Sequence, residues 1–316
     1  MISDLIEFRK DVLFNYSQYS FLPQLNKDRV FNTSIKNVIL NFEGNSDVES
    51  VSVDIMGFRH VFFVKFLPWD TDYFKINTYR LMYVLYEHSD YGILKKATDM
   101  FVGKFFRGKE CYCFSEIPSE DIRTIQALNE SGFKLVESRL TYYLDLRNYE
   151  NRRYQVRNAN TEDIINLKRV ARLMRNDFDR FHAEAVFNSS LADEFLATFI
   201  EESIKGFSDC VIVPNEPNVP PDAFLTANYL NDEWDDIGEK ISKMVLSAVS
   251  SESCKGWYIK LISEMAYHLK ERGANYAFMH PATTNRAVIH SYEKLGCKYG
   301  KCVHVLTYSS KKNVSI

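Results

Sequence analysis

A duplicated segment constrains the fold of this chain more than any other feature of its sequence. Residues 125–134 align with residues 289–298, and in both copies a helix-like stretch ends at a glycine and leads into a strand-like segment containing Leu-Thr-Tyr. The two triplets are offset by two residues, which we attribute to a difference in loop length. Self-similarity of this kind predicts two similar half-proteins. The copies differ chemically at one position, because Leu128 stands where the second copy has Tyr292, and only the phenol can donate a proton.

The length of the chain also favours two domains. At 316 residues it exceeds the size that one hydrophobic core usually serves. The polar and charged segment 148–153 is the best candidate for a linker. We therefore expect an N-terminal extension and a first domain within residues 1–150. Residues 151–316 would form the second domain, which carries the chemistry.

Local patterns predict several individual elements. A helical pattern covers residues 90–106, and residues 38–42 have the composition of a strand. Ser119 is placed to cap one helix and Thr161 another, each followed by acidic residues in the first turn. Residues 214–221 hold four of the eight prolines, so they should form an irregular loop that borders the site.

The composition excludes several functional classes. Hydrophobic residues at 46% and charged residues at 26% are ordinary for a globular protein, and a net charge of -3 provides no basic surface for nucleic acid. The apolar runs are too short to span a membrane, and the acidic N-terminus is unlike a secretory signal, so we expect a soluble cytoplasmic protein. Without a CxxC pair or an HExxH motif, we expect no bound metal.

The second half contains a junction that could hold a phosphate group. A strand-like segment at about 243–249 is followed by a short turn, by Gly256 and by a helix with one apolar face. The N-terminus of such a helix directs free N–H groups and the positive end of the helix dipole at one point. Many similar turns bind nothing, so this signal alone is weak.

The wider pattern around that junction resembles the GNAT superfamily of N-acetyltransferases. Residues 248–262 resemble the acetyl-CoA pyrophosphate loop of that family, and residues 285–296 resemble its N-x-x-A-x-x-x-Y-x-K-x-G signature, with Val288 in place of alanine. Residues 67–74 and 178–182 resemble segments of tandem-domain members of the TDP-fucosamine acetyltransferase type. The resemblance spans most of the chain beyond residue 60.

The resemblance implies a fold and a reaction. The expected fold is α/β (α+β), with two GNAT-like domains in tandem. Each would be a twisted, mixed, mostly antiparallel sheet flanked by helices, and only the C-terminal one would be complete. The expected reaction moves an acyl group from acetyl-CoA, or from another acyl-CoA, to the amine of a small molecule. Tyr292 would be the general acid, since a phenol with a pKa of about 10 is protonated at neutral pH.

The resemblance also implies a set of residues that bind the acyl donor. Ser253 stands where the family usually has Arg or Gln, and Tyr258 replaces the last glycine of the loop. Asn285 could hold the donor or the substrate, or could simply cap the helix that it begins. The implied set is Ala248, Val249, Ser250, Ser253, Cys254, Lys255, Gly256, Trp257, Tyr258 and Asn285.

The acceptor side is less defined. Arg180 and His182 lie in one of the segments that resemble the subgroup, and they could contact the phosphates of a TDP-amino sugar; a solvated salt bridge is the alternative for Arg180. His182 and His280 are candidates for the general base, beside a chain of waters. A homodimer is possible.

Two other functions fit the same sequence. The departures at Ser253 and Tyr258 would suit a degenerate module that binds acyl-CoA or a partner without catalysis. Transferases that take an aminoacyl group from tRNA also use paired domains of this kind. The net charge of -3 argues against a nucleic-acid substrate.

Overall fold

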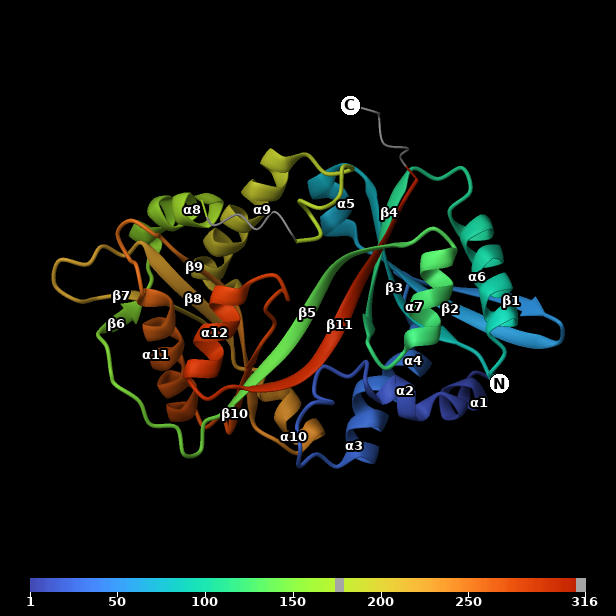
Figure 1. The fold of residues 1–316 in the computed structure, drawn as a ribbon, viewed down its shortest axis with the longest axis horizontal. Helices are drawn as coiled ribbons and strands as arrows, with labels where there is room; N and C mark the ends of the chain where they lie inside the picture. Colours follow the sequence, from blue (N-terminus) through green and yellow to red (C-terminus); the bar gives the residue numbers. More distant parts are fainter. Residues whose placement is uncertain (174–178, 311–316) are drawn as a thin grey trace. The chain divides into compact units, whose positions relative to one another are not determined.

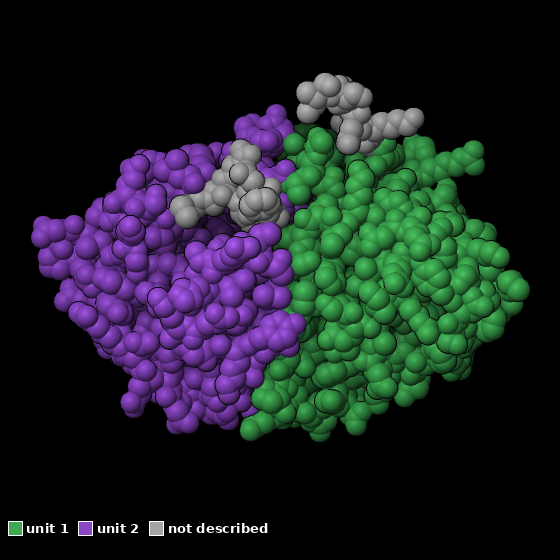
Figure 2. Space-filling view, viewed as in Figure 1, with its two compact units in different colours: residues 1–139, 183–187, 301–316 green, residues 140–182, 188–300 purple. Residues whose placement is uncertain are grey.

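The computed structural model describes residues 1–173 and 179–310 of the chain, which is drawn as a ribbon in Figure 1. Contacts between residues divide it into two compact units, shown in different colours in Figure 2. Unit 1 comprises Met1–Arg139, Ala183–Phe187 and Lys301–Ile316, and unit 2 comprises Leu140–His182 and Asn188–Gly300. The division falls inside two strands, whereas the sequence suggested a linker at 148–153.

Unit 1 is built on a mixed sheet with the strand order β1-β2-β3-β4-β11. Neighbouring strands are antiparallel except β3 and β4, which are parallel. The last strand, β11, comes from the C-terminal end of the chain, so this sheet is completed by a segment far from the others in sequence. The bounds are β1 Val48–Ile55, β2 Phe58–Phe66, β3 Asn77–Leu85, β4 Cys111–Pro118 and β11 Lys298–Ser309.

Helices cover both faces of this sheet. Because side chains alternate along a strand, Phe62 and Val64 of β2 pack with α6 and α7, while Val61 and Phe63 pack with the N-terminal helices. The first sixty residues therefore contribute a layer of the unit 1 core. The helices are α1 Ile2–Phe8, α2 Lys10–Phe14, α3 Lys27–Phe31, α4 Asn37–Leu40, α5 Pro68–Phe74, α6 Tyr91–Phe105 and α7 Ile122–Glu130.

Unit 2 has the strand order β5-β10-β9-β8-β7-β6. Here β9 and β10 are the parallel pair, and the edge next to β10 is filled by the end of β5, which comes from the first half of the sequence. Each unit thus receives one strand from the other half of the chain. The bounds are β5 Lys134–Asp145, β6 Val156–Asn158, β7 Cys210–Pro214, β8 Ala223–Asn228, β9 Ile241–Val249 and β10 Tyr276–Met279.

The sheet of unit 2 also has helices on both faces. Phe224 of β8 packs with α8 and α9, and its neighbour Leu225 packs with α11 and α12, as strand alternation requires. The helices are α8 Ile164–Leu173, α9 Ser189–Glu202, α10 Trp234–Ile237, α11 Trp257–Glu271 and α12 Arg286–Lys294. None of the helices within the described ranges combines the length and the apolar character that crossing a bilayer requires.

The two copies of the duplicated segment form the same local structure. In the first, the N–H of Phe133 donates to the carbonyl of Leu128 at 3.0 Å, and in the second the N–H of Cys297 donates to the carbonyl of Tyr292 at 2.9 Å. A glycine with positive φ ends each helix and leads into a strand. Both strands begin two residues after that glycine, so the offset between the Leu-Thr-Tyr triplets does not arise from loop length. The triplets lie at different positions along the strands.

Two element predictions in the first half are wrong. Residues 38–40 belong to α4 and residues 41–42 to the 3-10 helix that follows it, instead of a strand. Ser119 does not cap α7, because β4 continues to Pro118 and the N-cap position falls on Asp121. The carboxylate of Asp121 makes an ion pair with Arg9 and accepts a hydrogen bond from Tyr16 at 2.7 Å. These contacts involve residues more than a hundred positions away, and local capping patterns cannot anticipate them.

Two further predictions concern the second half. Asn160, and not Thr161, is the N-cap of the turn that leads into α8, and Asp163 completes its capping box. The proline-rich segment is an irregular loop between β7 and β8, as predicted. It borders the turn that follows β9, since the carbonyl of Pro220 accepts a contact from the thiol of Cys254 at 3.3 Å.

Candidate active site

The two parallel strands of unit 2, β9 and β10, separate a few residues after they begin. Pairing between β9 and β10 runs from Ile241 opposite Tyr276 to Lys243 opposite Phe278, and among the described residues it goes no further. β9 continues to Val249 and then turns into α11 (Figure 1). Within the described part of the chain, the last part of β9 therefore has a neighbouring strand on one side only. The backbone groups on its other side are free for a ligand.

A bulge in β9 accompanies this separation. Leu225 of β8 lies opposite Ser247 and Ala227 lies opposite Met244, so β9 has one more residue than β8 over this stretch. The N–H of Leu246 donates instead to the hydroxyl of Thr226 at 3.0 Å. An extra residue bends the bulged strand and increases its twist. The sequence contains no glycine here and gave no sign of the bulge.

The end of β9 leaves one set of backbone groups on its open side. The N–H of Ser250 donates to the carbonyl of Asp222 at 2.9 Å, and Ala248 has the same orientation, because hydrogen-bonded positions alternate along an antiparallel ladder. Val249 lies between them, so its N–H and C=O point away from β8. Of Ala248, Val249 and Ser250, the members of the predicted donor-binding set at the end of β9, Val249 is the one whose backbone groups face the open side.

The turn after β9 is closed by its own hydrogen bonds. The N–H of Cys254 donates to the carbonyl of Ser250 at 3.1 Å, and the N–H of Trp257 donates to the carbonyl of Cys254 at 3.0 Å. The hydroxyl of Ser253 donates to the carboxylate of Asp222 at 2.6 Å, so it anchors the turn to the preceding loop. Cys254 and Trp257 are buried beneath the turn.

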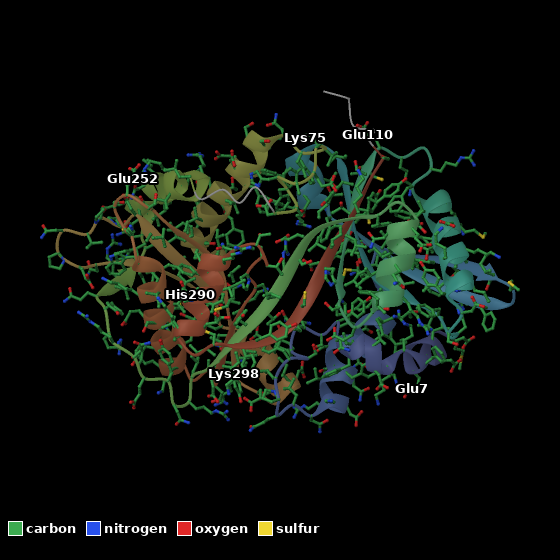
Figure 3. The ribbon with its side chains drawn as sticks, in the orientation of Figure 1. Glu7, Lys75, Glu110, Glu252, His290 and Lys298 are labelled. Atoms are coloured by element: carbon green, nitrogen blue, oxygen red, sulfur yellow. The ribbon has the colours of Figure 1, made fainter. Side chains whose placement is uncertain are left out.

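The centre of the turn has the features expected of an anion site. Gly256 is the N-cap of α11 with a φ of +83°, and no atom lies within 4 Å of the position that a Cβ would take. No side chain caps the helix, and among the described residues the N–H groups of Lys255 and Gly256 have no hydrogen-bond acceptor. Glu252 of the turn and His290 of α12 are exposed to solvent (Figure 3). An incoming anion would meet free N–H groups and the positive end of a helix dipole.

Unit 1 supplies an internal comparison, because its β3, α6 and β4 follow one another as β9, α11 and β10 do. The N-cap of α6 is Asp90, whose side chain accepts from the N–H of Ile93 at 3.1 Å. A carboxylate thus occupies the helix end that Gly256 leaves open in unit 2. The first copy also has Leu128, fully buried, in place of a phenol. Unit 1 lacks both features of the candidate site.

Tyr292 lies on the buried side of α12 with 6% of its surface exposed. Its hydroxyl accepts a hydrogen bond from the hydroxyl of Tyr258 at 2.8 Å, and the two rings are 6.1 Å apart. Tyr142 of β5 is a third phenol in the group, 5.7 Å from the ring of Tyr292. Burial raises the pKa of Tyr258 to about 12 and raises the pKa of Tyr292 well above its usual value. Both phenols are therefore protonated at neutral pH.

Two other predicted residues have structural partners. Asn285 is the N-cap of α12, and its side chain accepts from the N–H of Val288 at 3.2 Å, which is the capping alternative of the sequence analysis. His280, a candidate base at the end of β10, has its Nδ1 3.0 Å from the hydroxyl of Thr141. Among the described residues, no group of three or more His, Cys, Asp or Glu side chains could hold a metal ion.

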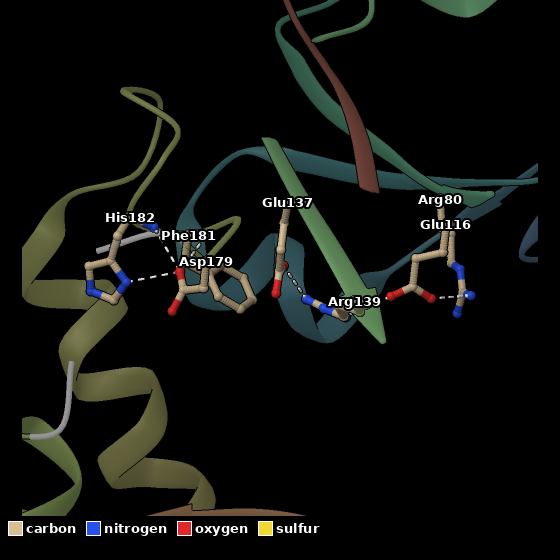
Figure 4. Close-up of polar contacts among 7 residues, drawn as sticks. All are labelled: Arg80, Glu116, Glu137, Arg139, Asp179, Phe181 and His182. Carbon is tan, nitrogen blue, oxygen red and sulfur yellow. Dashed lines mark hydrogen bonds and ion pairs between the residues drawn. The ribbon is translucent and has the colours of Figure 1, made fainter. Parts of the chain in front are cut away.

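The predicted acceptor residues lie in unit 2, in the segment between α8 and α9. The ring of His182 is 1% exposed and is held between Asp179 Oδ1, at 2.9 Å from Nδ1, and Asp193 Oδ1, at 3.0 Å from Nε2 (the Asp179 contact is drawn in Figure 4). Both ring nitrogens are thus already engaged. The guanidinium of Arg180 stacks over Phe181 at 4.4 Å. Phe178 of the same segment lies outside the described residues. The substrate-binding role of Arg180 and His182 stays a prediction.

Unit 1 contains a charged cluster that the sequence analysis missed. Arg80 of β3 and Arg139 of β5 both contact Glu116 of β4, at 2.6 Å and 2.8 Å, and Arg139 also contacts Glu137 at 2.7 Å (Figure 4). The four residues come from three strands that are distant in sequence. Glu137 and Arg139 are two positions apart on β5, so their side chains share a face of that strand. This spacing is the only feature of the local sequence that indicates the cluster.

Comparison with known proteins identifies the fold. No protein-family profile matches the sequence, and no curated protein sequence matches it. A GCN5-related N-acetyltransferase from Sphaerobacter thermophilus is similar in structure, with a TM-score of 0.55 and 8% identity over 100% of this chain and 96% of that one. A GNAT-family acetyltransferase from Colwellia psychrerythraea has a TM-score of 0.50 and 11% identity over 98% and 97% of the two chains.

A third similar structure is a GCN5-related glucosamine N-acetyltransferase region of a fungal multi-domain protein. Its TM-score is 0.57 with 12% identity, over 96% of this chain and 37% of that one. At these identities the likeness concerns the fold. The chain has an α/β GNAT fold, with mixed sheets flanked by helices, and the predicted fold class is confirmed.

Proposed function

We propose that this chain transfers an acyl group, in the first instance acetyl, from a coenzyme A thioester to an amine. One arrangement within unit 2 carries the proposal. The uncapped turn at Gly256, the open backbone of Val249 and the phenol of Tyr292 belong to successive elements around the gap between β9 and β10. The fold shared with GCN5-related N-acetyltransferases supports it.

The geometry suits the requirements of the reaction. Acyl transfer from a thioester needs groups that hold the donor, a neutral amine that attacks it and a proton for the departing sulfur. The N–H groups at Gly256 would hold the diphosphate of the donor, and the backbone of Val249 would bind its pantetheine arm. Tyr292, protonated at neutral pH, would give the proton. The open space beside Gly256 fits this assignment, because a larger residue would fill it.

The acceptor is proposed more broadly as an amine on a small molecule. A nucleotide-linked amino sugar, such as a TDP-amino sugar, is the class suggested by the segments that contain Arg180 and His182. The assay is release of free thiol from acetyl-CoA with a panel of TDP-amino sugars, glucosamine and simple polyamines. The proposal expects turnover with at least one of these amines. Absence of turnover with every amine would count against it.

A matched pair of variants tests the role of Tyr292. Tyr292→Phe keeps the ring and removes the proton, so we expect kcat to fall by about 100-fold or more. Tyr299→Phe is the control, since Tyr299 is 56% exposed and belongs to the same unit. Equal turnover in the wild-type chain and in Tyr292→Phe would reject the assignment of the acid.

A second candidate function is binding of acyl-CoA without catalysis. It is favoured by two departures within the loop: the hydroxyl of Ser253 is held by Asp222, and Tyr258 occupies the position of a small residue. Calorimetry and the thiol assay separate the two functions. A binding module would bind CoA and release no thiol with any amine, whereas the enzyme would do both.

A further inference from the structure

The side chain of Tyr258 reaches from the start of α11 to the phenol of Tyr292. Tyr258 directly follows Trp257, the first residue of α11, and Tyr292 lies on α12, which packs against α11. Their oxygens are 2.8 Å apart, within the range of a good O–H···O hydrogen bond. Both rings contact the same apolar core of unit 2. Two hydroxyls this close together in an apolar core share one hydrogen bond. One of the two phenols is its donor and the other is its acceptor.

We infer that Tyr258 is a positioning residue for acyl transfer, which donates a hydrogen bond to Tyr292 and leaves the Tyr292 O–H directed at the departing sulfur. The inference rests on the proposed function. A phenol has one hydrogen to donate. Because the bond between the two oxygens uses the hydrogen of Tyr258, the hydrogen of Tyr292 remains available.

The surroundings of the pair give the hydrogen bonds a direction. The Ser247 hydroxyl, on the bulged part of β9, hydrogen-bonds to Tyr258; burial raises the pKa of Tyr258 to about 12, and the bonds to Tyr292 and Ser247 oppose that rise. With the Ser247 hydroxyl donating to the oxygen of Tyr258, the single hydrogen of Tyr258 is left to point at Tyr292. The hydroxyl of the third phenol, Tyr142, is directed to Glu293 at 3.4 Å. Among the described residues, Tyr258 is the only hydrogen-bond partner of the Tyr292 hydroxyl.

This arrangement addresses a difficulty in the proposed reaction. A buried phenol with a raised pKa gives up its proton reluctantly to a thiolate, whose conjugate acid has a pKa of about 8.5. A hydrogen bond donated to the nascent phenolate of Tyr292 makes that transfer easier, and bonds to charged groups typically change an equilibrium by about 10- to 100-fold. Tyr258 supplies this bond at the oxygen where the negative charge develops.

The C–S bond of the tetrahedral intermediate breaks, and its electron pair goes to sulfur, which takes the hydrogen of Tyr292. The phenolate of Tyr292 keeps its hydrogen bond from Tyr258. The attacking nitrogen loses one proton to solvent, and solvent returns one proton to Tyr292. The products are the amide and the free thiol, and both phenols end the cycle protonated.

The test is Tyr258→Phe in the full chain, which keeps the ring and removes the donor. We expect CoA affinity by calorimetry and KM for acetyl-CoA to stay within about twofold, while kcat falls by about 10- to 100-fold. Tyr149→Phe is the control, because it removes a buried phenol of the same core whose hydroxyl bonds to Ser263 and not to Tyr292. Its kcat should remain within about twofold of the wild-type value.

A double-mutant cycle shows whether Tyr258 acts through Tyr292. Adding Tyr258→Phe to Tyr292→Phe should cause no further loss of kcat, since the hydroxyl that receives the bond is already absent. The same loss in both backgrounds would overturn the inference, and so would a loss of CoA affinity with kcat unchanged. An active wild-type chain with an equally active Tyr258→Phe variant rejects the inference alone. A wild-type chain without turnover on any amine rejects the proposed function and the inference with it.

Discussion

Replacing Gly256 by alanine perturbs the centre of the proposed anion site. Its φ of +83° is left-handed, which costs a residue with a Cβ about 1–2 kcal/mol. Alanine also makes the unfolded chain less flexible, which returns about 0.4–1 kcal/mol. No atom lies within 4 Å of the added Cβ, so no steric clash contributes. The net loss in the free energy of unfolding should be about 1 kcal/mol, which corresponds to a fall in Tm of about 2–4 °C.

The effect on binding should be larger than the effect on stability. The added methyl group enters the open space where the diphosphate would rest, so we expect the Kd for CoA to rise by about tenfold, equivalent to about 1.4 kcal/mol. Gly273→Ala is the matched control, since Gly273 also has a positive φ, of +93°, and no atom within 4 Å of its Cβ position. It lies between α11 and β10, at the other end of the helix.

Thermal unfolding and calorimetry with CoA measure both effects. We expect the two variants to lose similar stability and only Gly256→Ala to lose affinity for CoA. If Gly256→Ala bound CoA as tightly as Gly273→Ala, the turn would not be the place where the diphosphate rests. If both variants lost affinity equally, the loss would reflect general destabilisation.

Three other predictions concern stability and the duplicated segment. Asp121→Asn leaves Arg9 buried without its counter-charge, and urea unfolding should show a loss of about 3–5 kcal/mol. Burial lowers the pKa of Lys301 to about 8, from about 10.4 in the unfolded chain. Between these two pH values the unfolded chain then binds more protons than the folded chain. The free energy of unfolding should therefore rise with pH in this range by about 3 kcal/mol, and Lys301→Met should remove that rise. Leu128→Tyr should overpack the unit 1 core, lower Tm and fail to restore turnover to Tyr292→Phe.

The parts of the site that follow from short-range pattern could be predicted from the sequence. Gly256 needs a positive φ at the start of α11, and Asn285 caps α12 through a bond to an N–H three residues away. The helix expected at 90–106 is α6. In each case the physical cause lies within a few residues of the element that it shapes.

The features that depend on distant partners could not be predicted. Which strand fills the edge beside β4 or β10 depends on pairing between residues far apart in sequence, and the exchange of β11 and β5 has no local signature. The bond between Tyr258 and Tyr292 likewise requires two helices to pack together. The sequence marked Tyr258 as a departure from the family pattern, but the partner of its hydroxyl appears only in the fold.

Calorimetric titration of the full chain with CoA shows whether the turn at Gly256 binds the acyl donor. We expect one CoA to bind per chain, because α11 in unit 2 begins at an uncapped glycine while α6 in unit 1 begins at the carboxylate of Asp90. Gly256→Ala should weaken that single binding event. A chain that releases no heat with CoA, or that binds two equivalents, would show that the turn at Gly256 is not the single donor site.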